Sequence, residues 1–93
     1  EKAGAFAIVV EGVMSDVAQK ITKAINIPTI GIGAGNQTDG QVLVWSDMLG
    51  FFEEFKPKFV RHYLNGASLV KNAVEQYRID VQTQNFPNKE EEY

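Results

Sequence analysis

The sequence predicts an α/β fold with a parallel sheet, and three observations support this prediction. An unbroken apolar run at residues 5–10 is rich in branched side chains and lies between two glycines, as expected of a strand covered on both faces. An amphipathic segment follows at residues 15–25, and a second short apolar stretch begins after Pro28. A strand, a helix and a strand in this order are expected to pair in parallel through a right-handed crossover.

The first strand, expected over residues 5–11, ends on the carboxylate of Glu11. In parallel α/β folds, ligands bind at the loops that follow the carboxyl ends of the strands. Apolar neighbours such as Val9 and Val10 are expected to reduce the hydration of the carboxylate, which suits a general acid or base. The alternative is a solvated glutamate, or one that pairs with a lysine. Position alone therefore makes Glu11 a candidate catalytic residue, and Gly12 would let a substrate approach it closely.

The segment after the first strand has the spacing of an amphipathic helix. Val17, Ile21 and Ile25 recur at four-residue steps and would form one apolar face. Ser15 is the expected N-cap, because its hydroxyl can accept a hydrogen bond from the first turn. Pro28 is expected to end the helical region.

The second strand is expected over residues 29–34 and contains alternating glycines. Gly31, Gly33 and Gly35 do not have the G-x-G-x-x-G spacing of a dinucleotide-binding turn, and they continue into a turn-like stretch. Anion binding by their backbone and close packing against a neighbouring segment are equally good interpretations. Residues 41–45 are interpreted as a short third strand, although the stretch also fits a helix, and Trp45 is expected to be a core residue.

The second half of the chain has a helical pattern. A helix is expected to start near Pro57, to present an apolar stripe and to stop at residues 65–66. That stripe would consist of Phe59, Val60, Tyr63 and Leu64. A longer amphipathic helix is expected at residues 68–83, and residues 86–93 form a polar tail that is loosely held unless Phe86 or Tyr93 docks.

Three other polar residues are weaker candidates for chemistry. Asp39 and Asp47 have no histidine or acid at metal-ligand spacing, so we expect both to be solvated turn residues. His62 has no acidic or nucleophilic neighbour and is expected to be a surface or half-buried histidine on the helix near Pro57.

Composition restricts the classes of function. The chain has 93 residues, a formal net charge of −3 and no cysteine. Nucleic-acid binding is not expected, because it requires clustered positive charge. No apolar stretch approaches the roughly 20 residues that span a bilayer, so no membrane insertion is expected, and the missing cysteines fit a cytoplasmic protein. Because the chain lacks an initial methionine and soon enters a buried strand, we expect a fragment of a longer polypeptide.

Long stretches of the sequence resemble one enzyme family. "GAFAIVVEGV", "IPTIGIGAGNQTDGQVLVWSDMLGFFEEFKPKFVRHYLNGA" and "NFPNKEEEY" are similar to the C-terminal part of the ketopantoate hydroxymethyltransferases. The resemblance implies part of a (β/α)8 barrel of the phosphoenolpyruvate and pyruvate type. Residues 1–85 would supply its last strands, at 5–11, 29–34 and 41–45, with the closing helices, and residues 86–93 would be the tail.

The resemblance also implies a reaction in pantothenate biosynthesis. A hydroxymethyl group would pass from 5,10-methylenetetrahydrofolate to 3-methyl-2-oxobutanoate and form ketopantoate, with Mg²⁺ holding the keto acid. Glu11 matches the catalytic acid/base glutamate of the family. The metal and substrate ligands would belong to an N-terminal segment outside these residues, so the fragment alone is expected to be inactive. A homo-oligomer, a decamer in the family, is implied as well.

Two alternatives differ from this interpretation. The chain could be a noncatalytic assembly or binding fragment that uses its long amphipathic helix as an interface. It could also belong to a keto-acid lyase of the same barrel superfamily, which would not need the folate.

Overall fold

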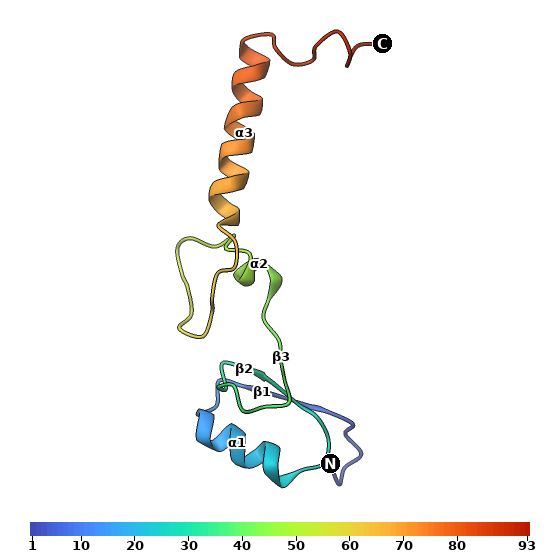
Figure 1. Cartoon of the computed structure of the whole chain (residues 1–93), viewed down its shortest axis with the longest axis vertical. Coiled ribbons are helices and arrows are strands. Elements are labelled where there is room, and N and C mark those ends of the chain that lie inside the picture. The colour runs from blue at the N-terminus through green and yellow to red at the C-terminus, as the bar shows by residue number, and fades with distance from the viewer.

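The computed structural model describes all residues from Glu1 to Tyr93 and contains three strands and three helices (Figure 1). In chain order they are β1 (Ile8–Glu11), α1 (Ser15–Ala24), β2 (Thr29–Ile32), β3 (Gly40–Gln41), α2 (Trp45–Met48) and α3 (Gly66–Gln82). The strands form one parallel sheet in the order β1-β2-β3. The predicted α/β organisation is therefore confirmed.

One face of the sheet packs against α1. Val10, Ala18 and Ala34 form a small buried cluster between β1, α1 and the end of β2, and Ile8 and Val13 pack against it. Because side chains alternate along a strand, Val9 and Glu11 belong to the opposite face. No helix of this chain covers that opposite face, and Val9 is 64% exposed there.

The first two strands are shorter than expected. β1 begins at Ile8 because its partner begins at Thr29, directly after Pro28, which has no N–H to continue a ladder. α1 begins at Ser15, as expected, but Met14 and not Ser15 occupies the N-cap position, and no side chain caps the helix. The predicted N-cap was therefore wrong. The side chain of Ser15 lies against Gly35 in the loop after β2 instead.

Residues 41–45 divide between strand and helix. The ladder to β2 ends with the bond from the Val42 N–H to the Gly31 carbonyl, 3.0 Å long. Trp45 begins the single turn of α2, so the predicted strand was wrong beyond Gln41. Trp45 is also not a core residue here, because it is 64% exposed and its ring meets the edge of Phe51 at 5.5 Å between centroids.

The helix expected near Pro57 does not form, and this prediction was wrong. The segment between α2 and α3 is an irregular loop whose end is bonded to α2. The Tyr63 N–H donates to the Met48 carbonyl (2.7 Å), and the Gly66 N–H donates to the Leu49 carbonyl (2.8 Å). These bonds replace the bonds to the fourth preceding residue that a helix would need. Asn65 is consequently the N-cap position of α3, not the end of an earlier helix.

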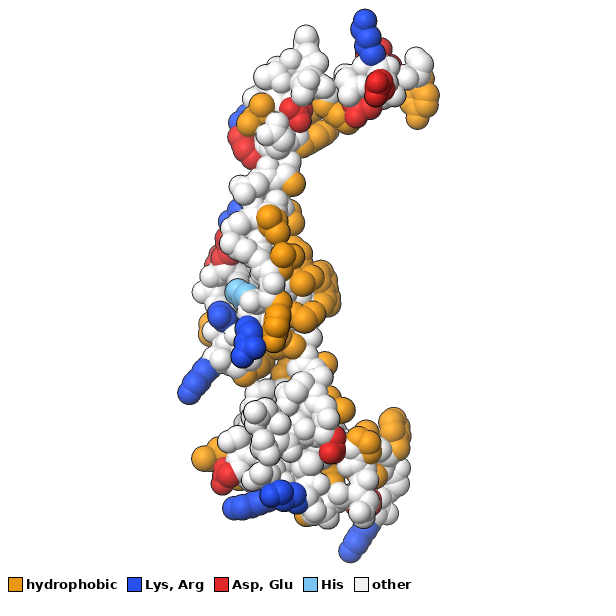
Figure 2. Space-filling model, in the orientation of Figure 1, with side chains coloured by type: hydrophobic (Ala, Val, Ile, Leu, Met, Phe, Trp, Pro, Cys, Tyr) orange, Lys and Arg blue, Asp and Glu red, His pale blue; other side chains and the backbone are white.

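The long helix α3 projects away from the sheet (Figure 1). The chain has a radius of gyration of 21.7 Å, whereas a compact chain of this length has about 12 Å. In α3 only Gly66 and Ala67 are buried. Hydrophobic side chains stay exposed along the helix (Figure 2), namely Leu69, Val70, Val74, Tyr77, Ile79 and Val81. None of the helices is both long and apolar enough to cross a membrane.

The tail after α3 contains no helix or strand. Phe86 docks on α3, with its ring edge against Tyr77 at 5.5 Å between centroids. Tyr93 makes no comparable contact and is fully exposed.

Candidate active site

Glu11 is the last residue of β1 and stands at the carboxyl edge of the sheet. It is paired in register with Ile32, the last residue of β2. Partners in a parallel ladder point to the same side, so both side chains lie on the face that α1 leaves bare. Two neighbouring strands therefore end together at this edge, with one carboxylate and one apolar side chain.

The backbone fixes where Glu11 lies. Gly12 has φ +61°, a left-handed conformation that glycine adopts readily. Its N–H donates to the Ile32 carbonyl over 2.9 Å, so the turn after Glu11 is attached to β2. A Cβ on Gly12 would meet no atom within 4 Å, which leaves the space beside the carboxylate open.

The carboxylate of Glu11 is exposed and forms no hydrogen bond or ion pair with another side chain. We expected the apolar neighbours of Glu11 to reduce the hydration of its carboxylate, but within this chain they do not. Val10 points toward α1, and Val9 is itself largely exposed on the bare face. Any desolvation of Glu11 therefore requires atoms beyond these residues.

A hollow of about 890 Å³ lies at the carboxyl ends of β2 and β3. Its wall includes Ile32, so the hollow lies one strand away from Glu11. The loop between α2 and α3 closes another side, because Phe59 would contact a Cβ on Gly33 at 3.0 Å. Arg61 and Tyr63 come from the same loop and also line the hollow. Their place at the hollow could not be predicted from the sequence, because the segment has the pattern of a helix.

The alternating glycines serve close packing. A Cβ on Gly31 would lie 2.6 Å from the Thr38 hydroxyl oxygen, and a Cβ on Gly35 would overlap the Cβ of Ser15. The chain continues from these glycines into β3, not into a helix. The interpretation as packing residues is therefore favoured over an anion-binding turn, which needs a helix N-terminus.

Asp39 has a structural role that its sequence context does not indicate. Its carboxylate accepts hydrogen bonds from the backbone N–H of Thr29 (2.9 Å) and from the Thr29 hydroxyl (3.1 Å). Thr29 is fully buried, and its hydroxyl also lies 2.8 Å from that of Thr22 on α1. The network joins α1, β2 and the start of β3 at the amino ends of the strands. This is the edge of the sheet opposite the one where Glu11 lies. Asp39 is thus more than a solvated turn residue.

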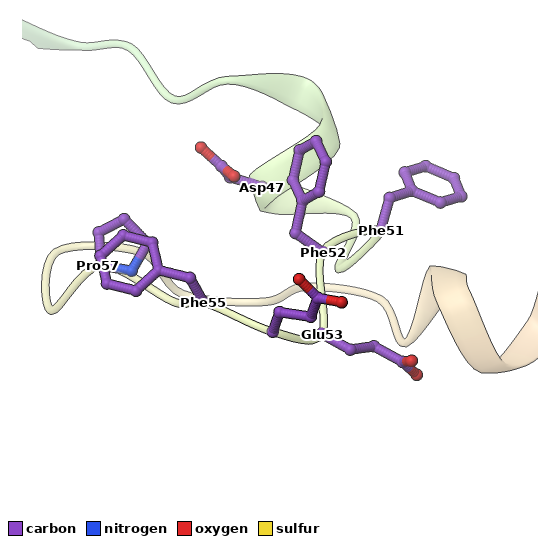
Figure 3. Close-up of a pocket in the computed structure, with 7 residues that line it drawn as sticks. Asp47, Phe51, Phe52, Glu53, Phe55 and Pro57 are labelled. Atoms are coloured by element: carbon purple, nitrogen blue, oxygen red, sulfur yellow. The ribbon is translucent and has the colours of Figure 1, made fainter.

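A second hollow, of about 690 Å³, lies in the loop after α2 and away from the strands (Figure 3). Its rings, from Phe51, Phe52 and Phe55, point in different directions, and Asp47 lines it from α2. Asp47 is half-buried in the first turn of α2, so it is not the solvated turn residue that was expected. His62 is exposed, as expected, but lies in the irregular loop.

Metal-ligating side chains do not converge in this chain. No group of three or more histidine, cysteine or acidic side chains is close enough together to hold a metal ion. Glu11 is the only acid within the three strands, and Asp39 lies at the other edge of the sheet. The donor set on these residues does not fit a Mg²⁺ site, which needs several oxygen ligands around one point.

Comparison with known proteins identifies the family. The family model described as ketopantoate hydroxymethyltransferase matches residues 1–89. The chain belongs to this family. It is 82% identical over all its 93 residues to the 3-methyl-2-oxobutanoate hydroxymethyltransferase of Aliarcobacter butzleri, and it covers 35% of that protein. The resemblance found in the sequence is therefore confirmed.

Other relatives give the same result. The chain is 63% identical to the 3-methyl-2-oxobutanoate hydroxymethyltransferase of a Nitratiruptor species and covers 36% of it. It is 62% identical to the enzyme of that name in one strain of Helicobacter pylori and covers 34% of it. The chain thus spans about a third of the length of these ketopantoate hydroxymethyltransferases.

Proposed function

We propose that these residues are the C-terminal portion of a (β/α)8 barrel whose complete form is a ketopantoate hydroxymethyltransferase. The complete protein transfers a hydroxymethyl group from 5,10-methylenetetrahydrofolate to 3-methyl-2-oxobutanoate and forms ketopantoate. Membership of the family and identity of up to 82% over the whole chain support the reaction. The parallel strands, with exposed apolar side chains on one face, support the barrel.

The position of Glu11 is the single observation on which the catalytic proposal rests. In a (β/α)8 barrel the helices lie outside and the bare sheet face turns inward, with the active site at the carboxyl ends of the strands. Glu11 is at that end of β1 and on the face without a helix. The remaining strands would then enclose the face and supply the low-hydration surroundings that this chain alone does not give to the carboxylate.

In the proposed reaction Glu11 is a general acid or base. The carbon next to the carbonyl of the keto acid must lose a proton before it can attack the methylene group of the folate. A carboxylate fixed by the Gly12 turn can exchange a proton with the bound reactants without moving the backbone. Such a positioned group contributes about 10²- to 10⁴-fold to a rate.

The Mg²⁺ that the resemblance implies needs ligands other than those present here. Since the donor set of these residues does not fit the ion, we place its ligands in the part of the polypeptide that precedes residue 1 in the complete protein. The chain by itself is then inactive. Homo-oligomeric assembly and cytoplasmic location are predictions of the same proposal.

The test is product formation by the complete polypeptide. It should form ketopantoate from 3-methyl-2-oxobutanoate only when 5,10-methylenetetrahydrofolate is present. A keto-acid lyase would turn over its substrate equally well without the folate. A noncatalytic assembly protein, which the exposed apolar side of α3 would suit, would form no product in either case.

A further inference from the structure

Three cationic side chains lie close together in the second half of the loop between α2 and α3, after Glu53 and Glu54 in its first half. Lys56, Lys58 and Arg61 lie within six residues that contain no acid, although the whole chain has a net charge of −3. None of the three forms an ion pair, whereas Arg78 on α3 is paired with Glu75. Figure 2 shows blue side chains gathered beside the single histidine, His62. The three cations therefore have no close ion-pair partner in this chain.

Arg61 belongs to the wall of the hollow at the carboxyl ends of β2 and β3, one strand away from Glu11. Its guanidinium carbon lies 5.8 Å from the centre of the Tyr63 ring, and one of its nitrogens donates to the Tyr63 hydroxyl over 3.4 Å. A guanidinium held against an aromatic ring keeps free N–H groups in a planar fork, the geometry that binds a carboxylate with two hydrogen bonds. The hollow thus has an anion-binding group at one side, while Ile32 forms the wall next to the catalytic edge.

The lining of the hollow suits the larger of the two reactants. The hollow is open to solvent in these residues, so the nature of its side chains carries the argument. Phe59 and Tyr63 offer aromatic surface, and Phe59 lies directly over Gly33. A folate has an aromatic ring system at its reactive end, an aryl group in the middle and carboxylates in its glutamate tail. Those groups match an aromatic surface that ends in an arginine.

We propose that Arg61 binds the glutamate carboxylates of the folate donor, with the donor lying along the hollow so that its reactive end reaches Glu11. This inference rests on the proposed function, because the transferase reaction is what brings a folate to this edge. Arg61 is a binding residue for one reactant, and the keto acid makes no contact with it.

The experiment compares two donors that differ only in the tail. Tetrahydrofolate carries the glutamate, whereas tetrahydropteroate ends at the benzoate. The complete polypeptide is assayed with the 5,10-methylene form of each donor. In a separate fluorescence titration, the equilibrium binding of tetrahydrofolate and of tetrahydropteroate is measured without the methylene group. The variants are Arg61→Gln, Arg61→Lys and, as a matched control, Lys23→Gln. Lys23 is an unpaired, exposed cation in the last turn of α1, at the opposite edge of the sheet.

Arg61→Gln should raise the KM and Kd for the tetrahydrofolate compounds about 5- to 10-fold, as expected for loss of one charge-assisted contact near the surface. The values for the tetrahydropteroate compounds and for 3-methyl-2-oxobutanoate should stay unchanged. Arg61→Lys should recover part of the loss, and Lys23→Gln should behave as the wild type.

Several results would overturn the inference. An equal increase in KM and Kd for both donors would mean that Arg61 does not bind the glutamate tail. A raised KM for the keto acid alone would assign Arg61 to the other reactant. Unchanged constants would remove Arg61 from binding altogether. If the wild-type protein forms no ketopantoate, the proposed function fails. The binding titrations still decide the tail contact in that case, because they need no turnover.

Discussion

Glu11 and Ile32 are the last residues of two adjacent parallel strands and are paired in register. The N–H of Gly12, the residue after Glu11, donates a hydrogen bond to the Ile32 carbonyl. The pair places one acid and one apolar side chain at the carboxyl edge of the sheet, beside a hollow that Ile32 helps to line. The edge therefore combines the carboxylate that we propose as the acid/base group with an adjacent open hollow.

Replacing Glu11 by glutamine in the complete polypeptide should lower kcat about 10²- to 10⁴-fold, because the amide keeps the size of the side chain but cannot exchange a proton. The rate of ketopantoate formation under saturating substrates measures this effect. Glu92→Gln, in the exposed tail, removes the same charge and should leave the rate unchanged. Near-equal rates for Glu11→Gln and the wild type would exclude Glu11 from the reaction.

Removing the hydroxyl of Thr29 should destabilise the sheet. Thr29→Val loses hydrogen bonds to Thr22 and Asp39 at a fully buried site, which should cost about 1–3 kcal/mol in the free energy of unfolding. Urea denaturation of the complete protein measures the loss. Thr83→Val is the control, since its hydroxyl bonds an exposed carbonyl of α3 and its loss should change stability little. Equal effects at both sites would contradict a structural role for the Thr29 network.

Substituting alanine at Gly35 should be more costly than at Gly4. Both glycines have positive φ, +76° and +94°, so both substitutions introduce backbone strain. A Cβ on Gly35 would overlap Ser15, whereas one on Gly4 would meet no atom within 4 Å. In the complete protein, Gly35→Ala should lower the free energy of unfolding by about 1–3 kcal/mol more than Gly4→Ala, by analogy with overpacked sites. If the two variants lose equal stability, the contact with Ser15 does not constrain the loop.

The 93-residue chain prepared alone should not unfold cooperatively. Only nine residues are buried, and many large apolar side chains are exposed, so little hydrophobic area opposes the loss of chain entropy. Calorimetry should show no sharp transition, and a dye that binds apolar surface should fluoresce strongly. The complete polypeptide is the control and should show the reverse. A sharp transition of the isolated chain would mean that these residues form an independent domain.

The ion pair in α3 makes a prediction about pH. The hydrogen bond from Arg78, together with its charge, holds the pKa of Glu75 below its ordinary value of 4.5. Because the folded pKa is the lower one, the pair stabilises the helix above about pH 4.5 and loses its effect as the pH falls through the lowered value.

Circular dichroism of a peptide spanning residues 65–83 should therefore show a small loss of helix between pH 6 and pH 2, small because both groups are exposed. Glu75→Gln and Arg78→Gln should each reduce that pH dependence by a similar amount. A pH dependence that survives both substitutions would assign it to another group.

Local elements and the family could be predicted from the residues alone. The apolar run before Glu11, the four-residue steps of α1 and the stripe of α3 depend on neighbours within one or two turns, so their types and approximate places could be predicted. The position of Glu11 at a strand end followed from the same run. The long contiguous resemblance also implied the family and the proposed reaction, which no local pattern contains.

The contacts that join distant segments became visible only in three dimensions. The loop containing Phe59 and Arg61 has a helical sequence pattern, but its backbone forms hydrogen bonds to the end of α2. Its side chains line one side of the hollow at the end of β2. Asp39 looked like a turn residue until the ladder placed it beside the buried Thr29. Such contacts depend on hydrogen bonds and packing between residues far apart in sequence, which periodicity within a single segment does not reveal.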